Sequence, residues 1–173
     1  FAVAPDALQR LGDGREEAAK LADLIEDLAA DHDYLVIDTP GSDNILSRVG
    51  HSFADTLITP MNDSFVDLDL LARVDGETLE IKGPSVYAET VWEQLRRRAE
   101  RDAGKIDWIV MRNRMSALDP RNKREVEKIL EALSKRIGFR IAPGIGERVI
   151  FRELFLLGLT LLDLRDVRTR FTV

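Results

Sequence analysis

Polar residues follow four apolar runs of the sequence, and these junctions are the places where the chain could do chemistry. Asp38 and then Thr39, Pro40 and Gly41 come directly after the run Tyr34–Ile37. An acid at the tip of a buried strand can hold magnesium through water beside the phosphates of a nucleotide. A glycine close behind it lets the backbone approach a phosphate. The alternative is a capping aspartate before a proline turn, and this short motif alone favours neither interpretation.

Two further junctions carry residues that suit the edge of a purine base. Asn113 comes two residues after the run Ile106–Met111, and an Asn side chain offers both a hydrogen-bond donor and an acceptor. Pro143 opens a loop after Phe139–Ile141, and this loop could pack beside a planar ring. Both could instead be turn residues, because Asn, Pro and Gly are common where a chain reverses.

The densest basic run of the chain lies between positions 96 and 105. Arg97, Arg101 and Lys105 are spaced by four residues, so they share one face if a helix continues that far. Such a face could contact the phosphates of DNA. It could equally be a solvated helix surface with a Glu93–Arg97 ion pair. A second candidate surface consists of Arg112, Arg114, Arg121, Lys123 and Arg124.

The periodicity of apolar residues predicts the elements that position these side chains. Helices are expected over 15–31, 45–52, 65–73, 84–101, 119–136 and 149–157, and buried strands over 34–37, 55–60, 106–111 and 139–141. Residues 75–83 are expected to form a loop with at most a short extended piece. Alternating strands and helices predict one α/β domain over residues 1–173, with a mostly parallel sheet and helices on both faces. Ligands bind beyond the carboxyl ends of such strands.

Composition narrows the class of protein. The 173 residues are 45% hydrophobic and 32% charged, which is enough to form a buried core. The absence of cysteine excludes disulfides and thiolate chemistry. No run is long and apolar enough to cross a bilayer. Residues 1–80 hold 5 basic and 18 acidic side chains, whereas residues 81–173 hold 20 and 13, so the second half can present a basic face to an anionic partner.

Three further features are expected to be structural. The apolar stretch Phe151–Leu162 is expected to be a core helix followed by a buried segment, with a dimer surface as the alternative. Trp92 and Trp108 are expected to pack in the interior. His51 is expected to be a capping or surface residue.

Four strings taken together resemble one family of nucleotide-dependent regulators. They are LVIDTPG (35–41), TPMNDSF (59–65), MRNR (111–114) and RVIFRELF (148–155). They occur in this order along most of the chain and are similar to the MipZ branch of the ParA/MinD deviant-Walker ATPases. The second and fourth strings are the specific ones, because DTPG alone occurs widely among P-loop proteins.

The resemblance implies a P-loop fold and roles for individual residues. Asp38 would be the Walker B acid that acts on magnesium through water, and Thr39 to Gly41 would sense the γ-phosphate of ATP. Asn113 and the loop at Pro143 would border the adenine. The family implies slow ATP hydrolysis and a homodimer that forms when ATP is bound. It also implies a ParB-type partner, FtsZ as a target, DNA binding without sequence preference, and a cytoplasmic location at the nucleoid.

One departure from the family pattern is large. Its phosphate-binding loop ends in Gly-Lys-Ser/Thr, and no such string occurs in these 173 residues. Because the chain starts at Phe1 rather than Met, we expect that an N-terminal part lies outside it, and that these residues alone do not hydrolyse ATP. The alternatives are a non-catalytic adaptor that keeps the fold and its protein-binding surfaces, and an ordinary metabolic P-loop enzyme.

Overall fold

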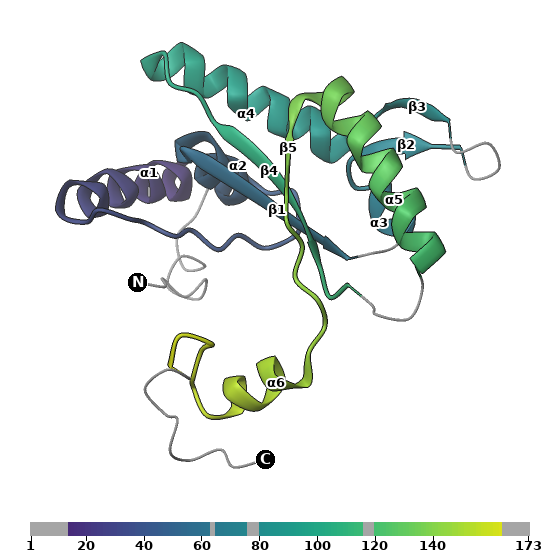
Figure 1. Ribbon diagram of the computed structural model, residues 1–173. Helices are drawn as coiled ribbons and strands as arrows, with labels where there is room; N and C mark the ends of the chain where they lie inside the picture. Colours follow the sequence, from purple (N-terminus) through teal and green to yellow (C-terminus); the bar gives the residue numbers. More distant parts are fainter. Residues whose placement is uncertain (1–13, 63–64, 76–79, 116–119, 164–173) are drawn as a thin grey trace.

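The computed structural model of the chain describes residues 14–62, 65–75, 80–115 and 120–163, and its centre is a parallel sheet (Figure 1). The sheet consists of β1 (Thr56–Asn62), β4 (Asp107–Asn113) and β5 (Arg140–Ala142), in the order β1-β4-β5. Asn62 pairs with Asn113, and Met111 pairs with Ala142, so the three carboxyl ends lie at one edge. The predicted fold class, an α/β fold of the P-loop type with a mostly parallel sheet, is confirmed.

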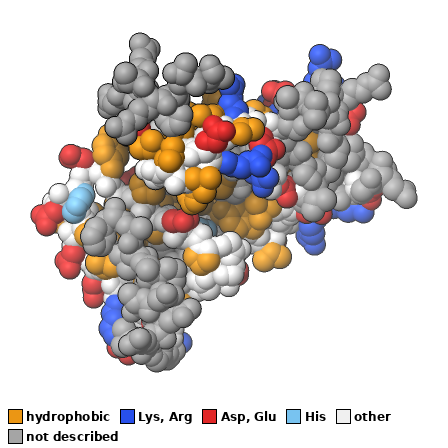
Figure 2. Space-filling model, turned by 90° about the horizontal axis from the view of Figure 1, so that it is seen from below, with side chains coloured by type: hydrophobic (Ala, Val, Ile, Leu, Met, Phe, Trp, Pro, Cys, Tyr) orange, Lys and Arg blue, Asp and Glu red, His pale blue; other side chains and the backbone are white. Residues whose placement is uncertain are grey.

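Alternation along the strands gives the sheet one buried face. Leu57, Met61, Trp108 and Val110 point into the main core, as expected for side chains two residues apart on a strand. Ile58 points to the opposite face, where 54% of it is exposed. Hydrophobic side chains gather at the centre of the face that is seen from below (Figure 2).

Two long helices cover the buried face. α4 (Val86–Asp102) is capped at its N-terminus by Ser85, whose Oγ accepts a hydrogen bond from the backbone N–H of Ala88. Its C-cap is Ala103, which has the left-handed conformation. α5 (Pro120–Leu133) continues into a single π-helical turn over Ser134–Gly138. Its buried residues have helical spacing, as predicted from the sequence: Val126, Leu130 and Leu133.

Two further helices pack against each other, and the second of them also packs beside α4. α1 (Gly14–Asp31) lies against α2 (Ile45–Phe53), and α2 starts at Asn44, whose side chain accepts from the N–H of Ser47. Arg48 joins the loop before α2 to α4, because it donates to both carboxylate oxygens of Asp43 and to Glu93. The position of α2 is therefore fixed from two sides.

The prediction of a strand over Tyr34–Ile37 is wrong. This segment is extended but has no paired strand neighbour among the described residues, and β1 pairs with β4 alone. Tyr34 is 90% exposed and Val36 is 81% exposed, whereas a strand of a parallel sheet is buried on both faces. An apolar run becomes a strand only where a neighbour supplies the ladder of hydrogen bonds. In Figure 1 the segment runs in the same general direction as β1.

The region between β1 and α4 also differs from the prediction. The helix expected over 65–73 is only the single turn α3 (Phe65–Leu68), and β2 (Ala72–Val74) pairs with β3 (Ile81–Pro84) in an antiparallel hairpin. Pro84 therefore ends a strand rather than starting a helix. The register of this hairpin shifts at Arg73/Val74, and such short irregular strands leave no clear period in the sequence.

α6 (Val149–Leu156) is present as predicted but does not lie in the core. Leu154 is buried, whereas Phe155 is 82% exposed and Leu156 is 84% exposed. The predicted core role of the stretch Phe151–Leu162 is therefore wrong for most of its side chains. Trp108 is buried as expected, and Trp92 is partly exposed while its indole N–H donates to the carbonyl oxygen of Ile137. Among the helices described, none has the length and apolarity that a membrane crossing requires.

Candidate nucleotide site

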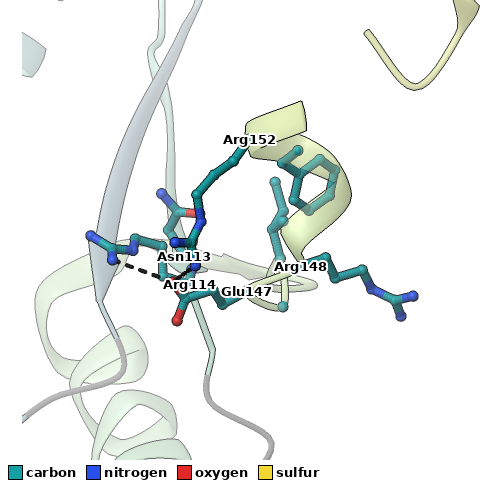
Figure 3. A pocket seen from close by; sticks show the side chains of 8 residues that line it. Asn113, Arg114, Glu147, Arg148 and Arg152 are labelled. Atoms are coloured by element: carbon teal, nitrogen blue, oxygen red, sulfur yellow. Dashed lines mark hydrogen bonds and ion pairs between the residues drawn. The ribbon is translucent and has the colours of Figure 1, made fainter. Parts of the chain in front are cut away.

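A pocket lies beyond the carboxyl ends of β4 and β5, where a parallel sheet is expected to bind its ligand. Its volume is about 550 Å³, within the range of small-molecule sites. α6 forms the far wall, and the strand ends and their loops form the near wall (Figure 3). The lining residues are Asn113, Arg114, Ile145, Gly146, Glu147, Arg148, Phe151 and Arg152.

Backbone hydrogen bonds hold the two loops of the near wall together. The N–H of Met115 donates to Ile145 at 3.0 Å, that of Ile145 to Arg112 at 2.8 Å, and that of Glu147 to Met115 at 3.1 Å. Gly144 makes this contact sterically feasible. A Cβ atom at that position would lie 2.7 Å from Sδ of Met115 and 2.8 Å from the carbonyl oxygen of Arg112. The pocket wall therefore depends on glycine at position 144.

Asn113 enters the pocket from the last position of β4. Its Oδ1 accepts a hydrogen bond of 2.9 Å from the N–H of Arg114, and Arg114 has a positive φ of 50°. This local turn orients the Asn113 side chain. Its Nδ2 group has no partner in the part of the chain that the structure describes, so it can donate to a ligand.

The charge around the pocket is positive on balance. Oε1 of Glu147 accepts from Arg114 at 3.4 Å and from Arg152 at 3.0 Å (Figure 3). Arg148 extends away from this pair in the same view. Three arginines and one glutamate thus line the pocket, and this balance of charge favours an anionic ligand. Phe151 adds a flat apolar surface on which a planar ring can stack.

The predicted phosphate-side residues lie away from this pocket. Asp38, Pro40 and Gly41 are exposed and are not among the lining residues. Thr39 is half-buried, and its Oγ1 lies 3.5 Å from Nε2 of His51. Nothing lies within 4 Å of a Cβ built at Gly41, so this backbone is open to an approaching group. The described residues contain no group of three or more acidic, His or Cys side chains placed to hold a metal ion.

Of the two predicted adenine-bordering residues, the structure places only Asn113 in the pocket wall. Pro143 is exposed and is followed by Ile145 and Gly146, which do line the pocket. Glu147 and Arg152 line the pocket although they were not predicted as site residues. Their position after the fourth strand was the available signal, because loops beyond strand ends form the site in this fold class.

The predicted DNA face on α4 is largely paired within the molecule. Arg97 donates to Glu93 at 2.6 Å, and Arg101 lies 3.2 Å from Asp102 with its guanidinium 4.0 Å from the ring centre of Phe53. The helix ends at Asp102, so Lys105 does not continue its face. Of the second candidate surface, Arg112 is buried and Arg114 borders the pocket. The side chains of Arg121 and Lys123 lie outside the described residues.

Comparison with known proteins identifies the family of this chain. A search of curated proteins finds no match. The family model described as ATPase MipZ matches residues 3–172, which is nearly the whole chain and includes both the Asp38 segment and the pocket. The chain therefore belongs to the MipZ family of ATPases.

Proposed function

We propose that this protein is an ATP-dependent dimerisation switch that regulates the placement of the division site or chromosome segregation in bacteria. The observation that carries the proposal is the pocket at the carboxyl ends of β4 and β5, in a chain that matches an ATPase family over residues 3–172. The family match supports ATPase activity in division control. We propose in addition that the protein forms a dimer, hydrolyses ATP slowly and binds partner proteins.

The residues present fit the base end of a nucleotide. The amide of Asn113 would donate to the adenine edge, and Phe151 would stack on the ring. The positive charge of Arg114, Arg148 and Arg152 suits an anionic molecule. At the other end, the exposed carboxylate of Asp38 would hold magnesium through water, and Thr39 to Gly41 would lie beside the γ-phosphate. Bound ATP with magnesium would supply the phosphoryl group that is hydrolysed and the charge that joins two subunits.

The proposed partners use surfaces outside the pocket. A homodimer forms when ATP is bound, and the protein partners are a ParB-type protein and FtsZ. The exposed apolar side chains of α6 are one candidate protein-binding surface: Phe155, Leu156 and Leu157. DNA would be bound without sequence preference by Arg97, Arg101 and Lys105 or by the arginines near the pocket, in the cytoplasm at the nucleoid.

Sedimentation of the intact protein with ATP or ADP tests this proposal. We expect a dimer with a slowly hydrolysed ATP analogue and magnesium, and a monomer with ADP, because a ligand that bridges two subunits stabilises the dimer by mass action. Asp38→Ala should abolish the difference, and Lys135→Ala, on the exposed π-helical turn, is the matched control. A monomer under all conditions would contradict the switch and would support the non-catalytic adaptor instead.

A further inference from the structure

His51 is a buried histidine that no role assigned above explains. It lies in the last turn of α2 and is only 9% exposed, so the expectation of a capping or surface residue is wrong. Gly50 beside it lets the segment before Pro40 approach the helix closely. A Cβ at Gly50 would lie 3.3 Å from methyl carbons of both Ile37 and Thr39. The segment that carries Asp38 therefore packs directly on this turn of α2.

The imidazole of His51 connects Thr39 to the core of the sheet. Its Nε2 lies 3.5 Å from Oγ1 of Thr39, and its ring contacts the ring of Tyr87 edge-on, with the centres 6.3 Å apart. The hydroxyl of Tyr87 is hydrogen-bonded to Oγ1 of Thr59 at 2.7 Å, and the indole N–H of Trp108 donates to the same oxygen at 3.0 Å. A continuous path of side chains thus runs from Thr39 through α2 and α4 to β1 and β4.

The burial of Nδ1 of His51 without a partner favours one direction for the Thr39–His51 hydrogen bond. Nδ1 of His51 is buried and has no hydrogen-bond partner among the described residues. A proton on Nδ1 would create an unpaired buried N–H, and such groups are rare in native proteins. Burial lowers the pKa of His51, while the nearby carboxylate of Asp43 acts in the opposite direction. The lowered pKa favours the neutral ring, and the unpartnered Nδ1 favours the tautomer with its proton on Nε2, in which Nε2–H donates to Thr39.

We propose that His51 is a positioning residue for the segment Thr39–Gly41: its Nε2–H holds the Thr39 hydroxyl and thereby couples this segment to α2, α4 and the sheet. The hydroxyl oxygen of Ser47, one turn earlier on α2, lies 3.4 Å from the carbonyl oxygen of Pro40 and 3.3 Å from that of Ser42, and a hydrogen bond to either supports the same placement. The role of the coupling in nucleotide response rests on the proposed function, in which Thr39 to Gly41 senses the γ-phosphate. The coupling itself does not require nucleotide.

The first test measures the histidine directly. In a long-range ¹H–¹⁵N spectrum of the intact protein at pH 7, His51 should show a protonated Nε2 and a bare Nδ1, and Thr39→Val should shift the Nε2 signal. Thr39→Ser keeps the hydroxyl and should leave that signal close to its original position. A proton on Nδ1, or an Nε2 signal that does not respond to Thr39→Val, would overturn the proposal.

The second test measures the coupling between the two residues. His51→Phe keeps a ring against Tyr87 but lacks the donor, and we expect it to raise the unfolding equilibrium constant of the intact protein roughly fivefold, as for loss of one hydrogen bond. Thr39→Val should give the same increase, and the double variant should give no more than either single one. His51→Gln retains an N–H donor and should restore most of the stability. Additive single effects would refute the coupling.

The same variants separate this inference from the proposed function. In the intact protein, His51→Phe should weaken ATP-dependent dimerisation roughly fivefold, by the free energy of that hydrogen bond, and His51→Gln should restore it. If the wild-type protein does not dimerise with ATP while the unfolding and tautomer results hold, then the switch is wrong and the positioning role stands. If ATP dimerisation occurs but His51→Phe and His51→Gln weaken it equally, then the positioning role is wrong.

Discussion

At the scale of single residues, one threonine hydroxyl serves two aromatic side chains in the core. Oγ1 of Thr59 accepts from the indole N–H of Trp108 and is hydrogen-bonded to the hydroxyl of Tyr87. Thr59 is itself buried at the centre of β1. Replacing this hydroxyl by a methyl group would leave two buried polar groups without their partner, and an unsatisfied buried group costs more than a hydrogen bond gains.

We therefore predict that Thr59→Val lowers the free energy of unfolding by about 1–3 kcal/mol, although the side-chain volume hardly changes. Thr59→Ser keeps the hydroxyl and should lose less, because only one methyl group is removed. Urea unfolding followed by tryptophan fluorescence measures both variants, since Trp108 reports on this site directly. A larger loss in Thr59→Ser than in Thr59→Val would show that packing, and not the hydrogen bonds, dominates here.

At the scale of elements, the pocket depends on how closely two loops approach each other. Gly144 and Gly146 are two residues apart in the same loop, but a Cβ at Gly144 would lie 2.8 Å from a backbone oxygen, whereas at Gly146 the nearest atom is 3.9 Å away. Backbone oxygens cannot move aside as flexible side chains can. The two positions therefore form a matched pair of substitutions.

Gly144→Ala should separate the loops, lower the free energy of unfolding by about 1–3 kcal/mol as overpacking does, and weaken nucleotide binding. Gly146→Ala should leave the stability within about 0.5 kcal/mol of the original value. Thermal unfolding and titration with a fluorescent ATP analogue give the two measurements. Equal behaviour of the two variants would mean that the close approach of Gly144 to Arg112 and Met115 is not required.

The elements also show what the sequence can predict and what it cannot. The spacing of Val126, Leu130 and Leu133 identified α5, because helical periodicity is a property of the segment itself. The run Tyr34–Ile37 was assigned to a strand because it is apolar, but pairing depends on a neighbour that no local pattern encodes. The exposure of Phe155 and Leu156 was not predicted, because burial also depends on neighbours that no local pattern encodes. Asn113 lines the pocket as its place at a strand end predicts. Glu147 and Arg152 also follow a predicted strand, but no local pattern shows that α6 forms the far wall of the pocket.

At the scale of the whole molecule, the buried His51 makes stability depend on pH. Burial lowers its pKa below the ordinary value of 6.5 in the folded protein, so just below pH 6.5 the unfolded chain binds a proton that the folded chain does not. Because the unfolded state then holds more protons, the free energy of unfolding falls as the pH drops through 6.5. Below the folded pKa both states bind the proton, and His51 causes no further loss. Well above pH 6.5 both states hold a neutral His51, and its contribution to the slope fades out.

Urea unfolding between pH 7.5 and pH 5 should show this loss of stability, and His51→Phe should flatten the slope in that range. Five described acids have pKa values lowered from ordinary values of 3.8 or 4.5, so they act mainly below pH 5 and do not mask the effect: Glu16, Asp43, Asp102, Asp107 and Asp163. Tyr87 titrates far above this range, because burial raises its pKa. A slope that His51→Phe leaves unchanged would assign the pH dependence to another group.

We expect the pocket between β4, β5 and α6 to receive the base of ATP. Photolabelling of the intact protein with 8-azido-ATP, followed by peptide mapping, tests this most directly. The label should fall on the pocket-lining residues within 113–114 or 145–152, and excess ATP should prevent it. A competable label confined to other segments, with none in these two, would contradict the placement of the nucleotide.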